Sequence, residues 1–165
     1  MIRKANISDA QSIVKININE WKNTYNGIFP KNVLANLESK YDESVIKCQN
    51  KINEYLVYEK DNKIVGFLRF GVNKKGYENN YAEIYALYVD SDYQDLGIGK
   101  DLVNYLKKLL LNSYDFILVS TLKENNANNF YQKIGCEKIA TCEFKLEDEI
   151  YEENLYVISI KKKYL

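Results

Sequence analysis

The stretch that decides the fold is AEIYALYVDSDYQDLGIGK, residues 82–100. Its first half is an apolar run that predicts a strand. A polar loop then leads through Gln94-Asp95-Leu96-Gly97-Ile98-Gly99 directly into a helix. Two glycines one residue apart leave main-chain N–H groups uncovered at the helix start, where the positive end of the helix dipole also lies. Such a place binds anions, so the segment predicts a phosphate-bearing ligand held by backbone groups.

Length and charge narrow the class of protein. The chain has 165 residues, the size of one ordinary domain, so we expect a single domain over residues 1–165. Lysine plus arginine number 23, as do aspartate plus glutamate. A chain without net charge has no bulk attraction to nucleic acid or to an anionic membrane, and we expect neither as a partner. The run Lys161-Lys162-Lys163 is interpreted as a solvated end.

The chain contains no histidine and three widely spaced cysteines, Cys48, Cys136 and Cys142. This excludes most zinc sites and every Ser–His or Cys–His nucleophilic pair, so we expect no metal. Buried free thiols are typical of a reducing cytoplasm. The N-terminus lacks the apolar core of a signal peptide, and no apolar run approaches the roughly 18 residues of a membrane helix. We therefore expect a cytoplasmic protein.

The remaining pattern predicts helices and strands around one mixed α/β sheet. The strand–helix–strand order over residues 81–121 predicts a right-handed parallel crossover, with antiparallel strands on both sides of it. Asp61-Asn62 predicts a hairpin turn, Ser8 to Gln11 a capping box, and Asp42 the cap of a third helix. Expected strands cover residues 2–6, 55–58, 63–72, 81–90, 116–121, 136–146 and 150–160, and expected helices follow residues 8, 30 and 42 and cover residues 98–111 and 127–134.

Three motifs together resemble a known family. They are QDLGIG at residues 94–99, NNFYQKIG at residues 128–135 and WKNTYNGIFP at residues 21–30. The chain is similar to the GCN5-related N-acetyltransferase (GNAT) family, and to a bacterial subgroup with a W-x3-Y-x-G-I-x-P segment. The resemblance implies a mostly antiparallel sheet whose central parallel strand pair is splayed around the cofactor. It also implies transfer of an acetyl group from acetyl-CoA (coenzyme A) to a primary amine of a small molecule or protein, by direct attack in a ternary complex.

The resemblance implies where the coenzyme lies. Asn125 and the backbone of the strand at residues 87–89 would contact the pantetheine arm, and an N–H near Leu87 would face the thioester carbonyl. Asp95 stands where relatives usually carry a basic residue or glycine, and a carboxylate beside a diphosphate is repulsive unless it points to solvent. The implied cofactor-binding residues are Leu87, Tyr88, Val89, Gln94, Asp95, Leu96, Gly97, Ile98, Gly99, Lys100, Asn125 and Tyr131.

The resemblance also implies a catalytic pair. Tyr131 matches the tyrosine that relatives place beside the thioester sulfur, where its hydroxyl can protonate the leaving thiolate. A helical tyrosine beside Phe130 is also typical of a core. Glu83 is the candidate base, its alternative being a strand-edge carboxylate that faces solvent or pairs with a cation, and in many relatives a water chain replaces the base. Tyr85, on the same strand face as Glu83, is a candidate for orienting the amine.

Trp21, Tyr25 and Phe29 are spaced four apart, as expected of one aromatic stripe. The resemblance implies that they form the wall of the acceptor site, and core packing is the alternative. A different function, a non-catalytic acyl-CoA sensor or interaction module, stays open at this point. The last two strands could also pair across a homodimer. The sequence does not name the acceptor.

Overall fold

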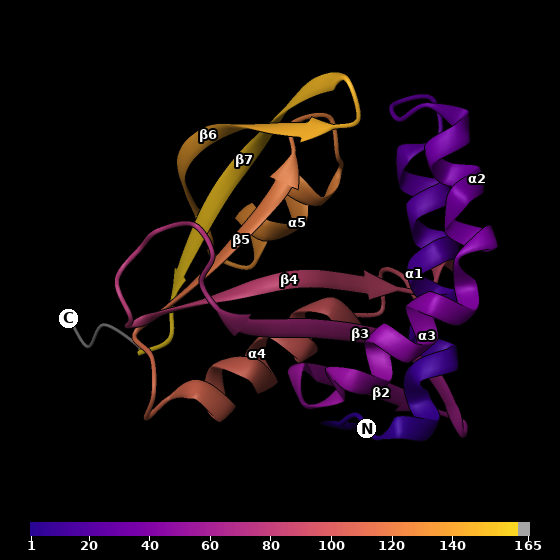
Figure 1. Ribbon diagram of the computed structural model, residues 1–165. Coiled ribbons are helices and arrows are strands. Elements are labelled where there is room, and N and C mark those ends of the chain that lie inside the picture. Colours follow the sequence, from indigo (N-terminus) through magenta and orange to yellow (C-terminus); the bar gives the residue numbers. More distant parts are fainter. Residues whose placement is uncertain (162–165) are drawn as a thin grey trace. The chain divides into compact units, whose positions relative to one another are not determined.

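The computed structural model describes residues 1–161, which form a mixed sheet with helices (Figure 1). The strands are β1 Ile2–Lys4, β2 Tyr55–Lys60, β3 Lys63–Val72, β4 Tyr81–Val89, β5 Phe116–Leu122, β6 Glu137–Leu146 and β7 Glu149–Ser159. The helices are α1 Ala10–Tyr25, α2 Lys31–Ser39, α3 Tyr41–Asn50, α4 Ile98–Leu110 and α5 Ala127–Lys133, with short 3-10 turns η1 Ile7–Asp9, η2 Ile52–Glu54 and η3 Ser91–Tyr93. Lys162 and Lys163 of the basic run lie outside the described residues, and Lys161 pairs with Asp115.

The sheet has the order β1-β2-β3-β4-β5-β7-β6 over the described residues. β4 and β5 are parallel, and their ladder joins Tyr81–Ile84 to Phe116–Val119, whereas β1–β2, β2–β3, β5–β7 and β6–β7 are antiparallel. The predicted parallel crossover between antiparallel flanks is therefore confirmed. The predicted hairpin is confirmed as well, because Asp61 and Asn62 have φ of 50° and 61°, the left-handed geometry that a tight two-residue turn requires.

The chain divides into two compact units, and each is described by itself. The first comprises Met1–Arg69 with Ala86–Tyr105, and the second Phe70–Tyr85 with Leu106–Leu165. The prediction of one domain over residues 1–165 stays a prediction.

In the first unit, helices cover both faces of the strands. Apolar side chains of α1 and α3 pack against Tyr55, Val57 and Phe67 on one face of β2 and β3. Gly66 precedes Phe67 and faces the other way, where a Cβ would lie 3.3 Å from Ile98 at the start of α4. This close packing fixes the position of the first turn of α4.

In the second unit, β7 lies between β5 and β6 and supplies much of the core. Leu155 and Tyr156 of β7 and Ile117 and Leu118 of β5 are buried. The register of β6 against β7 shifts at Lys138–Ala140. α5 packs on this layer through the rings of Tyr131 and Tyr156, whose centroids are 5.9 Å apart.

Two predicted helix caps are wrong. The capping box is not Ser8 with Gln11: the Asn6 side chain accepts the Ser8 N–H, and Asp9 accepts the Asn6 N–H. Asp42 lies inside the first turn of α3, and the cap position is Lys40. The first error arose because Arg3 holds Asp9 with two hydrogen bonds, a contact that moves the start of the helical segment toward Asn6.

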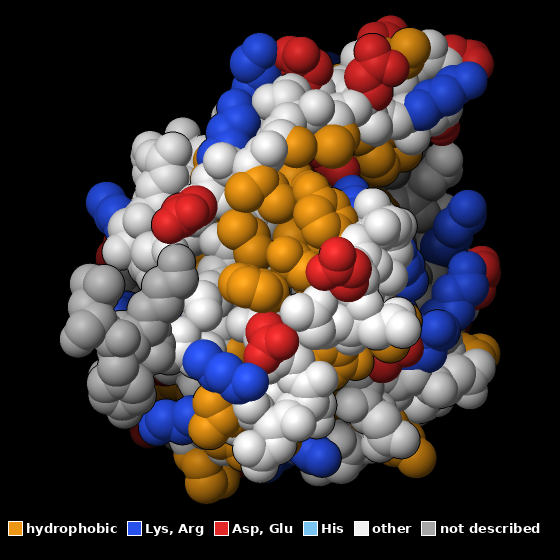
Figure 2. Space-filling model, turned by 90° about the vertical axis from the view of Figure 1, so that its left-hand side faces the viewer, with side chains coloured by type: hydrophobic (Ala, Val, Ile, Leu, Met, Phe, Trp, Pro, Cys, Tyr) orange, Lys and Arg blue, Asp and Glu red, His pale blue; other side chains and the backbone are white. Residues whose placement is uncertain are grey.

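Charged side chains of both signs are interspersed over the face seen in Figure 2, and apolar side chains gather near its centre. This pattern agrees with the net charge of zero.

Candidate functional site

The loop at residues 94–100, called here the glycine loop, presents free backbone donors at the start of α4. Asp95 and Gly97 have φ of 61° and 82°, which turns the chain sharply before the helix. The N–H groups of residues 95–100 donate to no acceptor within the described part of the chain, and the first helical bond of α4 is Asp101 N–H to Gly97 O at 3.0 Å. Because these donors converge at a helix N-terminus, the loop is suited to bind an anion.

Side chains of the glycine loop leave its donor face uncovered. Asp95, Leu96 and Lys100 are exposed, whereas Ile98 is buried and anchors the loop. A Cβ added to Gly97 would meet no atom within 4 Å. Asp95, the residue that departs from the family pattern, therefore reaches solvent. On the preceding strand, Leu87, Tyr88 and Val89 are half-buried.

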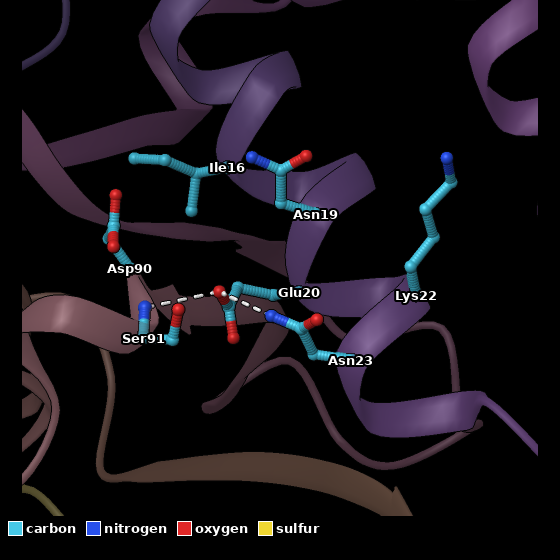
Figure 3. Close-up of a pocket in the computed structure, with 7 residues that line it drawn as sticks. All are labelled: Ile16, Asn19, Glu20, Lys22, Asn23, Asp90 and Ser91. Carbon is cyan, nitrogen blue, oxygen red and sulfur yellow. Dashed lines mark hydrogen bonds between the residues drawn. The ribbon is translucent and has the colours of Figure 1, made fainter.

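A polar pocket of about 180 Å³ lies in the same unit and was not found from the sequence. Figure 3 shows Glu20 projecting from α1 toward Ser91, and both Ser91 N–H and Asn23 Nδ2 donate to its Oε1, at 3.2 Å and 3.5 Å. The other oxygen, Oε2, accepts Gln94 Nε2 at 3.0 Å. The lining residues are Ile16, Asn19, Glu20, Lys22, Asn23, Asp90 and Ser91.

Glu20 is only 4% exposed although it carries a carboxylate. Burial raises the pKa of this carboxyl above its ordinary value, and the nearby charge of Asp90 acts in the same direction. The Ser91 N–H and the two side-chain amides oppose that rise. The position escaped sequence analysis because a glutamate in a polar helical segment is usually solvated.

In the second unit, Glu83 is buried on β4 and holds a loop. It is 6% exposed, and its Oε2 accepts the Lys74 N–H at 2.7 Å. The loop at residues 73–80 is itself organised by Asn73, whose Nδ2 donates to the carbonyls of Tyr77, Glu78 and Tyr81. The alternative in which Glu83 faces solvent is therefore wrong.

Tyr85 lies across β3, where only a glycine leaves room for its ring. A Cβ on Gly71 would come within 2.7 Å of the Tyr85 hydroxyl oxygen and 2.9 Å of its ring. The hydroxyl donates to the Val72 carbonyl, and Lys74 Nζ lies 4.2 Å from the ring centroid. These contacts fix the orientation of the Tyr85 side chain.

Tyr131 is buried on α5, close to the end of that helix. Its carbonyl accepts the Cys136 N–H at 2.9 Å, and Gly135, with φ of 93°, ends the helix as predicted. The hydroxyl of Tyr156, against which Tyr131 packs, donates to Asn128 Oδ1 at 2.7 Å. The backbone thus fixes the end of α5, and the Tyr131 ring packs against that of Tyr156.

Asn125 and Asn128, near the start of α5, make different hydrogen bonds. Asn125 Oδ1 accepts the N–H of Ala127, the first residue of α5, at 2.8 Å, whereas the N-cap position is Asn126. Asn128 donates to three backbone carbonyls and accepts from two side chains of β7, Asn154 and Tyr156. The sequence predicted Asn125 for the pantetheine arm and missed Asn128, whose buried network ties α5 to the sheet.

The aromatic stripe exists as predicted. The ring centroids of Trp21, Tyr25 and Phe29 lie between 4.6 Å and 5.7 Å apart. Tyr25 and Phe29 are buried, which favours the core-packing alternative for these two, whereas Trp21 is half-buried.

Other features of the described residues limit the chemistry. Among residues 1–161 there is no cluster of three His, Cys, Asp or Glu side chains that could hold a metal ion, and no helix that is long and apolar enough to cross a membrane. Cys48 and Cys136 are buried free thiols, and burial raises the pKa of Cys136 to about 11. The two buried thiols therefore stay protonated.

Comparison with known proteins places this geometry in context. The family model described as "Acetyltransferase (GNAT) family" matches residues 18–136. The "Uncharacterized N-acetyltransferase YuaI" of Bacillus subtilis (strain 168) is 26% identical over 146 residues, which are 88% of this chain and 84% of that protein. The "Spermidine N(1)-acetyltransferase" of Thermoplasma acidophilum is 26% identical over 158 residues, with 89% of each chain covered.

Among solved structures, the PaiA N-acetyltransferase of Thermoplasma acidophilum in complex with coenzyme A superimposes with a TM-score of 0.74. The match covers 93% of this chain and 96% of that chain, at 22% identity. At this level of identity the likeness establishes the fold alone.

Proposed function

This chain belongs to the acetyltransferase (GNAT) family, and from this premise we propose how its residues carry out acetyl transfer to a primary amine. It is an N-acetyltransferase that uses acetyl-CoA. The observation that carries the residue assignment is the set of uncovered N–H groups at residues 95–100. We assign these groups to the coenzyme diphosphate, because free donors at a helix N-terminus favour phosphate oxygens.

Acetyl-CoA supplies an activated acetyl thioester. Glu83 takes a proton from the acceptor ammonium, whose ordinary pKa is about 10, and so leaves a neutral nitrogen that can attack the thioester carbonyl carbon. The N–H near Leu87 donates to the carbonyl oxygen as negative charge develops there. Tyr131 gives its hydroxyl proton to the departing sulfur, so a C–N bond replaces the C–S bond. The new amide nitrogen then sheds its extra proton, which restores the Tyr131 hydroxyl, and the net proton released stays with Glu83. The burial of Glu83 supports its part, because a buried carboxylate that accepts the Lys74 N–H is held in one place on β4.

The acceptor is proposed as a primary amine of a small molecule or protein. The spermidine acetyltransferase among the relatives supports polyamines as the first amines to test. Trp21, the half-buried member of the aromatic stripe, and Tyr85, held beside the Lys74 side chain, are the proposed acceptor-site residues.

The test is release of free coenzyme A thiol from acetyl-CoA across a panel of amines that includes spermidine, amino acids and peptides. Tyr131→Phe should lower turnover by about 100-fold or more, the range for loss of a general acid, while coenzyme A binding stays near wild type. Tyr41→Phe, which removes a hydroxyl at the start of α3, is the matched control. Unchanged turnover in Tyr131→Phe would remove that residue from the mechanism. If no amine in the panel causes thiol release, the result would favour the alternative function, a non-catalytic acyl-CoA sensor.

A further inference from the structure

Glu20 is buried in a way that stability alone does not explain. None of the ion pairs within residues 1–161 includes it, so its charge is balanced only by neutral donors. Taking a carboxylate out of water without a cation is costly, and an apolar side chain would fill such a place more cheaply. The segments that supply its three donors therefore indicate what the buried carboxylate holds in place.

Two of those donors belong to the chain segment that enters the glycine loop. Ser91 donates its N–H and Gln94 its side-chain amide, from positions 71 and 74 residues away in the sequence. Both Glu20 oxygens are occupied in this way, one by each residue. The carboxylate thus connects α1 to both ends of the turn at residues 91–94.

The Gln94 amide is fully used inside the chain. Its Nε2 donates to Glu20 Oε2 and to the Val89 carbonyl, each at 3.0 Å. An amide nitrogen carries two N–H bonds, so no donor of this side chain is left for a ligand. The Gln94 side chain therefore links the end of β4 to α1.

Few other contacts orient the glycine loop before α4 begins. Upstream, Asp90 N–H donates to Val65 O at 2.9 Å and Tyr93 N–H to Asp90 O at 2.8 Å. The left-handed residues Asp95 and Gly97 follow Gln94 at once. Gln94 therefore holds the start of the glycine loop, while the buried Ile98 side chain holds its end, and the direction of the N–H groups between them depends on both.

We propose that Glu20 is a positioning residue for coenzyme binding: through Ser91 and Gln94 it holds the glycine loop in the orientation that presents its N–H groups to the diphosphate. The inference rests on the proposed function, since it assumes that this loop binds coenzyme A. Glu20 touches neither substrate nor reacting atoms in this role.

The decisive variant is Glu20→Gln, which keeps size and shape. Its amide oxygen can still accept the Ser91 N–H, but its NH2 group would face the Gln94 NH2 group, donor against donor. Gln94 cannot turn over to correct this, because its oxygen would then face the Val89 carbonyl. Gln94→Ala breaks the same contact from an exposed residue, so the test remains available if Glu20→Gln fails to fold.

The experiment measures coenzyme A affinity by titration calorimetry, and KM for acetyl-CoA and kcat at saturating acceptor, on the full chain. Each single variant should raise the coenzyme A Kd and the acetyl-CoA KM by about tenfold, the loss of one hydrogen bond to a charged group. The kcat should stay within about twofold, because the reacting groups are untouched. Glu43→Ala, an exposed helical carboxylate of the same unit, should bind coenzyme A like the wild type.

The double variant separates positioning from general damage. If both residues act through their shared contact, Glu20→Gln with Gln94→Ala weakens binding by about the same tenfold as either alone. A combined loss near hundredfold, an unchanged Kd in Glu20→Gln, or a fall in kcat without a change in KM would each overturn the inference. Wild-type protein that binds no coenzyme A would instead overturn the proposed function, so the two failures are distinct.

Discussion

Replacing Gly97 by alanine tests whether the glycine loop is the coenzyme site. Gly97 has φ of 82°, a conformation that costs an L-residue about 1–2 kcal/mol. A Cβ there meets no atom within 4 Å, so the folded protein adds no steric cost. We therefore expect a stability loss of about 1–2 kcal/mol, or a fall in Tm of about 2–8 °C for a chain of this size.

The loss of coenzyme A affinity in Gly97→Ala should be larger than the loss of stability suggests. The added methyl group would stand on the open side of the loop, where the diphosphate must approach the N–H groups. Loss of one charge-assisted hydrogen bond corresponds to about 10- to 100-fold in affinity. Calorimetric titration with coenzyme A measures this, and urea unfolding measures stability in the same samples.

Gly76, in the loop at residues 73–80, provides a matched control outside the glycine loop. Its φ is 79°, and a Cβ there also meets no atom within 4 Å. Gly76→Ala should lose about the same 1–2 kcal/mol of stability and no coenzyme A affinity. Equal affinity losses in the two variants, or wild-type affinity in Gly97→Ala, would show that the loop does not contact the diphosphate.

Two further predictions address the base and the N-terminal ion pair. Glu83→Gln should lower turnover by about 100-fold at unchanged coenzyme A affinity, measured by thiol release, and a loss under about threefold would point to water as the base. The hydrogen bond from Arg3 holds the pKa of Asp9 below its ordinary 3.8, so this stabilisation is full above that value and is lost as pH falls through and below it. Asp9→Asn should cost about 1–3 kcal/mol at pH 7 and flatten the acid side of the urea-unfolding profile, and an acid side as steep as in the wild type would count against the pair.

Local chemistry made much of the architecture predictable. The Asp61-Asn62 turn, the end of α5 before Gly135 and the start of α4 at Ile98 follow from backbone preferences within a few residues. The same holds for the parallel β4–β5 crossover, since handedness and connection length leave few alternatives. Helical spacing explains the contact of Trp21 with Tyr25, whereas Phe29 lies beyond the end of α1 and reaches Tyr25 through the turn at Gly27.

The first of the two predicted helix caps failed for a tertiary reason. Ser8 with Gln11 has the pattern of a capping box, but Asp9 is held by Arg3 of β1 and accepts the Asn6 N–H instead. A competing partner outside the helix decided which side chain caps it. Residue spacing along the helix does not contain that information.

The sequence by itself determined the order of elements and the family resemblance, and it predicted an anion site at residues 94–100, because each depends on neighbouring residues. Only the tertiary structure decided which charged side chains are buried and what they hold. Glu20 looks like an ordinary surface carboxylate in the sequence, and Glu83 was a candidate base with a solvent-facing alternative. In the structure each is buried and accepts a backbone N–H from another segment. Burial and pairing depend on segments that are distant in the chain, and folding alone brings these together.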